Sequence, residues 1–273
     1  MSTRKEPISL VVAQSAMCAV LYAMGAYLTS YISSPWGFGQ FRPAVVIPAV
    51  FSTLFGPVVG GVGAAIGTLI ADSVKHGQIY IRSLVSAVPG NFIGFYIFGM
   101  LVKRFSWRNF IKATQVSLLI ANFIVAFLYV YFRAFVEASL PVALRDVWIY
   151  VSLGLVAWWY VTMLPFVLLL GPPLIRAAYS AFPTFFSERL SSVPIQEVGG
   201  RFSVAMLLPG IIMASIGVGM ILTDPNWLIR LKVVSDQVMI MGMGIMFLVG
   251  GSILILIGLI LAPGRAALRL RQI

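Results

Sequence analysis

Cysteine and histidine are almost missing from this sequence, which holds one of each among its 273 residues, Cys18 and His76. A disulfide within the chain is excluded, because it needs two cysteines. A zinc site built from cysteine and histidine is not expected either, since such a site needs several of these ligands. We therefore predict that the chain binds no metal and carries no cofactor.

Acidic residues are also scarce: the chain has 8 Asp and Glu against 19 Lys and Arg. No pair of acids lies within one apolar segment, as a proton relay through a membrane would require. The GxxxxGK[ST] loop of nucleotide hydrolases is absent, as are the HExxH and GxSxG motifs of hydrolytic enzymes. These absences predict that the chain is not an enzyme and does not couple transport to ions through buried carboxylates.

Long apolar runs dominate what is present, since 60% of the residues are hydrophobic and 10% are charged. Runs of roughly 20 apolar residues are typical of membrane-spanning helices. Backbone polar groups inside a bilayer must bond within their own segment, which predicts an all-α, polytopic integral membrane bundle. The short alternating strands of a membrane β-barrel are absent. We predict eight spans: Ile8–Ile32, Pro43–Phe55, Pro57–Val74, Leu84–Val102, Phe110–Phe132, Trp148–Leu170, Phe202–Leu222 and Gln237–Leu261.

The net charge of +11 follows the ends of these spans. Membrane proteins keep Lys and Arg at such positions, so membrane lipid is an expected partner and nucleic acid is not. With the N-terminus inside, twelve of the 19 Lys and Arg fall on the inner side and seven on the outer side. The positive-inside rule therefore predicts a multi-pass protein of the cell membrane with both termini cytoplasmic.

Prolines and glycines divide the chain into three predicted parts. Residues 1–175 form a six-span bundle, residues 176–201 a cytoplasmic connection, and residues 202–273 a two-span tail. The segment from Gly171 to Gly200 holds four prolines and a pair of glycines, which is typical of a loop with or without an interfacial helix.

Small residues recur in the stretch Phe55–Asp72, FGPVVGGVGAAIGTLIAD. Glycine is costly inside an ordinary helix, but small residues in lipid let two helix backbones approach closely. We favour helix packing over substrate contact for the two ridges of this stretch. A further ridge in the first span fits either packing within the chain or docking to another membrane protein. The ridges are Gly56, Gly60 and Ala64; Gly63, Gly67 and Ala71; and Ser15, Ala19 and Ala23.

Two opposite charges, Arg42 and Asp72, lie at the outer ends of the second and third predicted spans. If these spans form a hairpin that turns at Gly56 and Pro57, the charges come close, and pairing lowers the cost of holding them near lipid. The acid meets either Arg42 or a ligand, and the pair is the favoured alternative.

Polar and large aromatic side chains also occur deep in the predicted spans. At 1.5 Å per residue, Asn91 lies about 10 Å from the outer end of its span, and Asn122 and Trp159 lie roughly 16 Å from theirs. Such groups, with the adjacent Trp158, line a ligand cavity or fill the bundle core, two alternatives of equal weight. The loop Ser33–Arg42, SSPWGFGQFR, is either a lid over that cavity or an interfacial anchor.

One segment, FRPAVVIPAVFSTLFGPVVGGVGAAIGTLIAD, resembles the second and third spans of substrate-binding S components of energy-coupling factor (ECF) vitamin transporters. The resemblance extends over Ile8 to Leu170 and includes the small-residue ridge of the first span. It implies a subunit without ATPase activity that captures a vitamin or related micronutrient from outside. It also implies a transmembrane T component and two cytosolic ABC ATPases as partners.

The resemblance further implies roles for particular side chains. The ridge of the first span matches the family's docking surface for the T component, and the family's pocket lies in the outer half of the bundle. The two C-terminal spans depart from the family pattern. The implied docking residues are Ser15, Ala19 and Ala23; the implied pocket residues are Trp36, Asn91, Asn122, Trp158 and Trp159, with Arg42, Asp72 and Arg82 at the rim.

Two other classes of protein remain as alternatives. A membrane scaffold or assembly protein without a ligand would use the glycine ridges for protein contacts only. A membrane enzyme that acts on lipid is disfavoured, because acids, histidines and metal ligands do not cluster. For a carrier, aromatic groups with few buried charges favour a flat and mostly neutral ring system as the substrate.

Overall fold

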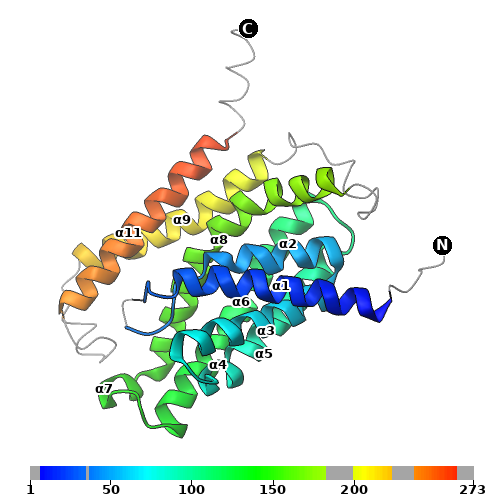
Figure 1. The fold of residues 1–273 in the computed structure, drawn as a ribbon. Helices are drawn as coiled ribbons and strands as arrows, with labels where there is room; N and C mark the ends of the chain where they lie inside the picture. The colour runs from blue at the N-terminus through cyan, green and yellow to red at the C-terminus, as the bar shows by residue number, and fades with distance from the viewer. Residues whose placement is uncertain (1–6, 35–36, 183–198, 223–236, 263–273) are drawn as a thin grey trace.

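The computed structural model describes residues 7–34, 37–182, 199–222 and 237–262, and within these ranges the chain is a bundle of helices (Figure 1). Its β pairing is a single bridge between Ser33 and Gln40 in the described part of the chain. The helices are α1 (Ile8–Thr29), a 3₁₀ turn at Pro43–Val45 followed by α2 (Val46–Phe55), α3 (Pro57–His76), α4 (Ile81–Val85), α5 (Ala87–Leu101), α6 (Trp107–Tyr131) with a π turn at Phe132–Val136, α7 (Val142–Arg145), α8 (Trp148–Ala181), α9 (Gly199–Leu222) and α11 (Gln237–Ile260).

An apolar helix lies at each of the eight predicted spans, which confirms the all-α, polytopic membrane bundle. Among the described residues, five helices are long and apolar enough to cross a membrane: Ile8–Thr29, Pro57–His76, Trp107–Val136, Trp148–Ala181 and Gly200–Leu222. Two apolar helices are shorter, Pro43–Phe55 and Ala87–Leu101, and α11 is apolar over Gly244–Ile260. The second predicted span is thus short, as its sequence indicated.

The end of α8 corrects one prediction. The sequence indicated a span that ends at Leu170, but the helix runs through Pro172 and Pro173 to Ala181. Packing overrides the local preference of proline here: Ile175 is 2% exposed, and a Cβ on Gly171 would lie 2.6 Å from the ring of Phe110. The first part of the predicted cytoplasmic connection is therefore helical, and residues 183–198 of it lie outside the described residues.

Glycine brings α1 and α3 into backbone contact. A Cβ on Gly63 would lie 2.4 Å from the Cys18 sulfur, and one on Gly67 would lie 2.7 Å from the Ala19 carbonyl oxygen. In lipid no hydrophobic force draws helices together, so such close approach is a main source of association. Packing, the favoured explanation of the glycine ridge, is confirmed for this pair of residues.

The turn between α2 and α3 also depends on glycine. Gly56 has a φ of 98°, a backbone conformation that other residues rarely adopt, and Pro57 begins α3. A Cβ on Gly60 would overlap Ser52 of α2, so the two helices meet closely beyond the turn. The predicted hairpin is confirmed, and it returns α3 toward the end of the bundle where α2 begins.

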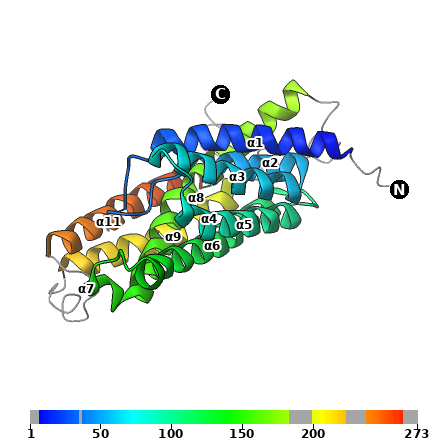
Figure 2. The same cartoon turned by 60° about the horizontal axis from the view of Figure 1, so that its bottom comes forward.

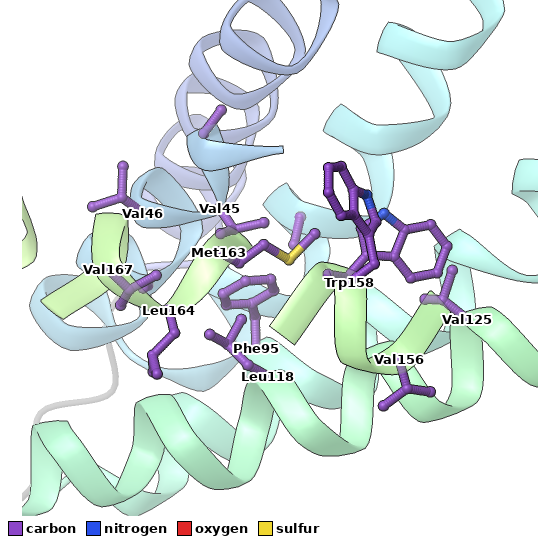
Figure 3. Close-up of a cluster of buried hydrophobic side chains, with 14 of the residues drawn as sticks. Val45, Val46, Phe95, Leu118, Val125, Val156, Trp158, Met163, Leu164 and Val167 are labelled. Atoms are coloured by element: carbon purple, nitrogen blue, oxygen red, sulfur yellow. The ribbon is translucent and has the colours of Figure 1, made fainter. Parts of the chain in front are cut away.

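The apolar core of the bundle lies where α2, α5, α6 and α8 meet (Figure 3). Phe95 of α5, Leu118 of α6 and Leu164 of α8 are each at most 2% exposed, and Val45 and Met163 pack into the same cluster. This core supports the polar side chains that lie closer to the end of the bundle where α2 begins.

Helices α9 and α11 form an antiparallel hairpin at one side of the bundle (Figure 1), built on small residues at every seventh position. Ser203 Oγ donates a hydrogen bond to the Gly258 carbonyl at 2.7 Å, and Gly210 and Gly217 face Gly251 and Gly244 across the pair. A seven-residue repeat keeps one face of each helix toward its partner. The hairpin packs chiefly on itself and contacts the six-helix core along α6 and α8.

We predict that Gly67→Ala destabilises the protein by about 1–3 kcal/mol, because the added methyl group forces α1 and α3 apart. The matched control is Gly242→Ala, at a helical position where a Cβ meets nothing within 4 Å. Thermal unfolding of both purified variants in detergent measures the difference. Equal melting temperatures for the two variants would show that the close contact of α1 and α3 is not limiting for stability.

Candidate functional site

A polar cavity lies at the end of the six-helix core where α2 begins and α3 ends. Its walls come from α1, α3, α4, α5, α6, α8 and the loop before α2, and it encloses about 540 Å³ of space between atoms, open mouth included. It is narrow, and the short α4 supplies part of its wall, beside α3 and α5 (Figure 2 shows these helices). Ligand cavities commonly have this mixture of polar and apolar walls, but the free interior of this one, about 60 Å³, is far smaller than the roughly 300–1,000 Å³ of such cavities.

Arg42 is the centre of the polar wall. Its guanidinium donates to Asp72 Oδ1, to Thr68 Oγ1 at 2.7 Å and to Gln40 Oε1 at 2.9 Å. Ser83 Oγ donates to the other oxygen of Asp72 at 2.7 Å. The favoured prediction for the acid, a pair with Arg42, is confirmed.

This ion pair is buried, with side-chain exposures of 10% for Arg42 and 6% for Asp72. Burial opposes a charged guanidinium, but Asp72 and Tyr22 together outweigh it and raise the pKa of Arg42 above its ordinary value. Arg42 and Asp72 meet because the turn at Gly56 returns the end of α3 to the start of α2.

One buried polar group of the cavity wall, the side-chain nitrogen of Asn122, lacks a hydrogen-bond partner among the described residues. Asn122 is 4% exposed, and the fully buried Tyr22 hydroxyl lies beside Arg42 and Thr68. A buried group without a partner costs about 1–3 kcal/mol, so a ligand or water that bonds to the Asn122 nitrogen would be stabilised.

The aromatic wall is formed by Trp159, Tyr80 and Tyr129. Trp159 Nε1 donates to the Gln40 carbonyl at 2.9 Å, which ties the loop before α2 to α8. Gly39 in this loop packs so closely that a Cβ would lie 3.2 Å from the Trp159 ring. The loop is further held by Phe38, whose ring lies 4.7 Å from the Arg133 guanidinium.

The predicted pocket residues separate into three groups. Five of the eight line the cavity together: Arg42, Asp72, Asn91, Asn122 and Trp159.

Trp158 and Arg82 do not line this cavity. Trp158 lies on the opposite side of α8, where it lines an apolar cleft shared with Met213 and Met246 of the hairpin. Arg82 is outside the mouth, paired with Glu137 at 2.7 Å and donating to the Tyr80 hydroxyl at 3.4 Å. The position of Trp36 is outside the described residues.

Sequence reasoning missed several cavity residues. Thr68 precedes Asp72 by one helical turn and so shares its face, a spacing that was visible in the sequence. Tyr22 and the two tyrosines of the mouth carry no local signal, because only the fold brings these helices together. The missed residues are Tyr22, Thr68, Tyr80, Ser83 and Tyr129.

The predicted docking ridge is buried inside the chain. Ser15 and Ala19 are 5% and 2% exposed and lie against Gly63 and Gly67 of α3, and Ala23 is 6% exposed. Packing within the chain, one of the two alternatives left open for this ridge, is what the structure has. A helix face that already contacts α3 is not available to a second protein while α1 and α3 remain together.

No three His, Cys, Asp or Glu side chains lie together in the part of the chain that the structure describes. The side chains of the cavity are instead hydroxyls, amides, aromatic rings and one ion pair. This set recognises an organic ligand by hydrogen bonds and ring contacts.

A comparison with protein families decides the class of the protein. The family of ECF-type riboflavin transporter S components matches residues 9–179, from α1 nearly to the end of α8. The chain belongs to this family. It is therefore a membrane substrate-binding subunit of an ECF transporter, and the resemblance found in the sequence is confirmed.

The family assignment covers the six-helix core and the polar cavity, while α9 and α11 lie beyond the matched residues. S components in general work with a T component and ABC ATPases. Neither the curated proteins nor the solved structures include a match to this chain.

We predict that Asp72→Asn lowers the free energy of unfolding by about 3–5 kcal/mol, because it leaves the buried Arg42 charge without its partner. The double variant Arg42→Gln/Asp72→Asn should recover part of this loss, since it removes both charges. A double-mutant cycle from detergent unfolding curves measures the coupling. Purely additive effects of the two single variants would contradict a coupled pair at this site.

Proposed function

We propose that this S component captures riboflavin in the polar cavity at the outer end of its core. The observation that carries the proposal is the combination of the family match with a cavity that offers aromatic rings and two amides near a polar cluster. The family description names riboflavin as the substrate of the matched proteins. A scaffold without a ligand would have no need of an unpartnered polar group in the wall of a cavity.

The chemistry of the wall suits this vitamin. The flavin ring is flat and presents alternating carbonyl and N–H groups along its pyrimidine edge, which side-chain amides such as Asn91 and Asn122 complement. Trp159 and Tyr129 supply faces or edges for contact with the ring system. The hydroxylated ribityl chain would lie against Arg42 and the groups bonded to it.

The loop before α2 is proposed as the lid of this cavity. It contributes Gly39 and Gln40 to the wall, and it is held to α8 by the hydrogen bond from Trp159. Because the closed cavity is narrow, a flavin would enter only when this loop moves away from α8.

The proposed orientation places both termini in the cytoplasm and the cavity mouth outside. The support is the distribution of Lys and Arg, with the cluster at residues 103–112 on the inner side. In this orientation the chain delivers the vitamin to the cell with energy from two ABC ATPases, through a T component, since the sequence has no P-loop of its own.

We also propose that the T component docks on the exposed face of α1, which carries Ala13 and Val20, instead of on the buried ridge. An apolar groove of α1, α2 and the end of α8 continues this face and includes Ala13, Leu21 and Ala178. Small residues here would let a partner helix approach closely.

We predict that purified protein quenches riboflavin fluorescence with sub-micromolar affinity and that Trp159→Phe weakens binding about tenfold, through loss of ring contact and of the bond to Gln40. Trp158→Phe is the matched control, because this neighbour lies outside the cavity. A fluorescence titration of both variants measures the difference.

Equal weakening by the two tryptophan substitutions would contradict the assignment of this cavity. If riboflavin does not bind at all, a melting-shift screen of other vitamins and nucleobases tests whether the cavity holds a different ring compound. A protein that binds none of them supports the scaffold alternative.

We predict that Gly39→Ala speeds riboflavin release, because a methyl group at this position pushes the lid away from Leu155 and Trp159. Gly37→Ala is the control. Gly37 and Gly39 both have a left-handed backbone, with φ angles of 74° and 81°, but a Cβ on Gly37 would meet nothing within 4 Å. Both variants bear the same backbone strain of about 1 kcal/mol, so stopped-flow dissociation rates isolate the contact. Equal release rates for the two variants would contradict a role of the Gly39 contact in closing the lid.

A further inference from the structure

Helices α6 and α9 lie side by side and contact each other (Figure 2), and the seam between their exposed side chains is called the groove below. At one end the rings of Trp107 and Phe202 are 6.3 Å apart. Further along both helices, Gln115 Nε2 donates a hydrogen bond to the Ala205 carbonyl at 3.4 Å. Because both helices pass this contact in the same direction, positions about one turn before Gln115 and Ala205 lie at one level of the groove.

Three basic side chains are gathered at that level. Lys112 precedes Gln115 and Arg201 precedes Ala205 by about one turn, and Arg108 lies one turn before Lys112. All three are exposed, and none forms an ion pair with a described residue. The described acids, Asp72, Glu137 and Asp146, belong to the opposite end of the bundle, so nothing in the described part of the chain neutralises these charges.

Apolar side chains continue the same helix faces away from the charges. Leu119 follows Lys112 by two turns, and Leu208 and Ile212 follow Arg201 by two and three turns. They are 53%, 59% and 54% exposed. A change from exposed basic to exposed apolar residues along one face marks the boundary between lipid headgroups and hydrocarbon.

The base of the groove has a further unpartnered group. Trp107 is 3% exposed, and its indole nitrogen has no hydrogen-bond partner among the described residues. Arg176 of α8 lies over the same ring at 5.6 Å. The groove therefore combines positive charge, a buried donor and an apolar wall at one place.

We infer that this groove binds an anionic phospholipid of the inner leaflet, with its phosphate at Arg108, Lys112 and Arg201 and an acyl chain along Leu119 and Leu208. Charge complementarity selects an anionic headgroup over a zwitterionic one, since a basic side chain near the surface contributes about 1 kcal/mol toward an anionic lipid. The inner leaflet follows from the orientation proposed above.

Such a lipid would connect the hairpin to the core. Among the described residues the hairpin contacts the core chiefly along α6 and α8, and it lies beyond the residues that the family matches. A lipid in the groove adds contacts to both α6 and α9, which stabilises their association without further protein contact.

The test uses the full chain in detergent and two lipids with identical acyl chains, phosphatidylglycerol and phosphatidylcholine. Native mass spectrometry should show phosphatidylglycerol retained in preference to phosphatidylcholine. Lys112→Gln/Arg201→Gln should weaken phosphatidylglycerol binding about tenfold. The control Arg133→Gln/Arg145→Gln removes the same charge at the opposite end of the bundle and should change binding by less than about twofold.

Equal retention of the two lipids by the wild-type protein would overturn the inference, and so would equal effects of the two double variants. The wild-type comparison decides the question even if a variant fails to fold, which melting curves without lipid reveal. Glycerol 3-phosphate separates lipid from free phosphate: displacement of the lipid by an equal concentration of it would contradict binding through the acyl chain.

Discussion

Close contact between α1 and α3 is the constraint on which the cavity depends. The absence of side chains at Gly63 and Gly67 lets α3 lie against the backbone of α1. Thr68 follows Gly67 directly, and Asp72 follows one turn later, so this contact fixes how both face Tyr22 and Arg42. In lipid, small residues provide the close packing that a hydrophobic force provides in water. The position of the polar wall is therefore a consequence of glycine spacing.

The close contact of α1 and α3 brings the buried ion pair together, and the ion pair in turn holds the helix ends in place. Arg42 and Asp72 would each be costly near hydrocarbon without a partner, but together, with Thr68, Gln40 and Ser83, they satisfy much of their bonding capacity. A polar network that is nearly complete holds the ends of α2, α3 and α4 in one arrangement. The unpartnered amide nitrogen of Asn122 in the cavity wall is the group that a ligand or water could satisfy.

Patterns within single helices made much of this architecture predictable. The apolar runs located eight helices, the glycine ridges indicated close packing, and the turn at Gly56 and Pro57 implied the pair of Arg42 with Asp72. The same patterns do not decide which way adjacent residues face. Trp158 and Trp159 differ by one position, yet the first packs toward the hairpin and the second lines the cavity.

The differences between the structure and the expectations from sequence have a related physical cause. Depth in the membrane, from which Arg82 and Trp158 were assigned, says nothing of rotation about the helix axis, which tertiary contacts decide. The end of α8 was placed at Leu170 because paired prolines oppose a helix, but the contact of Gly171 with Phe110 holds the helix to the core. The ridge of Ser15, Ala19 and Ala23 fits two kinds of partner equally well by spacing, and only the fold shows that α3 occupies it.

The C-terminal hairpin is also held by close packing of small residues, but this packing lies between α9 and α11 instead of within the core. Its small residues recur at every seventh position, so each helix directs one face to the other and leaves little close-packing surface for the core. Its attachment then depends on a few large contacts, such as Trp107 with Phe202, and on whatever fills the groove beside them. The hairpin packs on α6 and α8, which also line the substrate cavity, but in the described chain no hairpin residue lines that cavity. An element added to a membrane bundle in this way can therefore be retained without any change to the cavity.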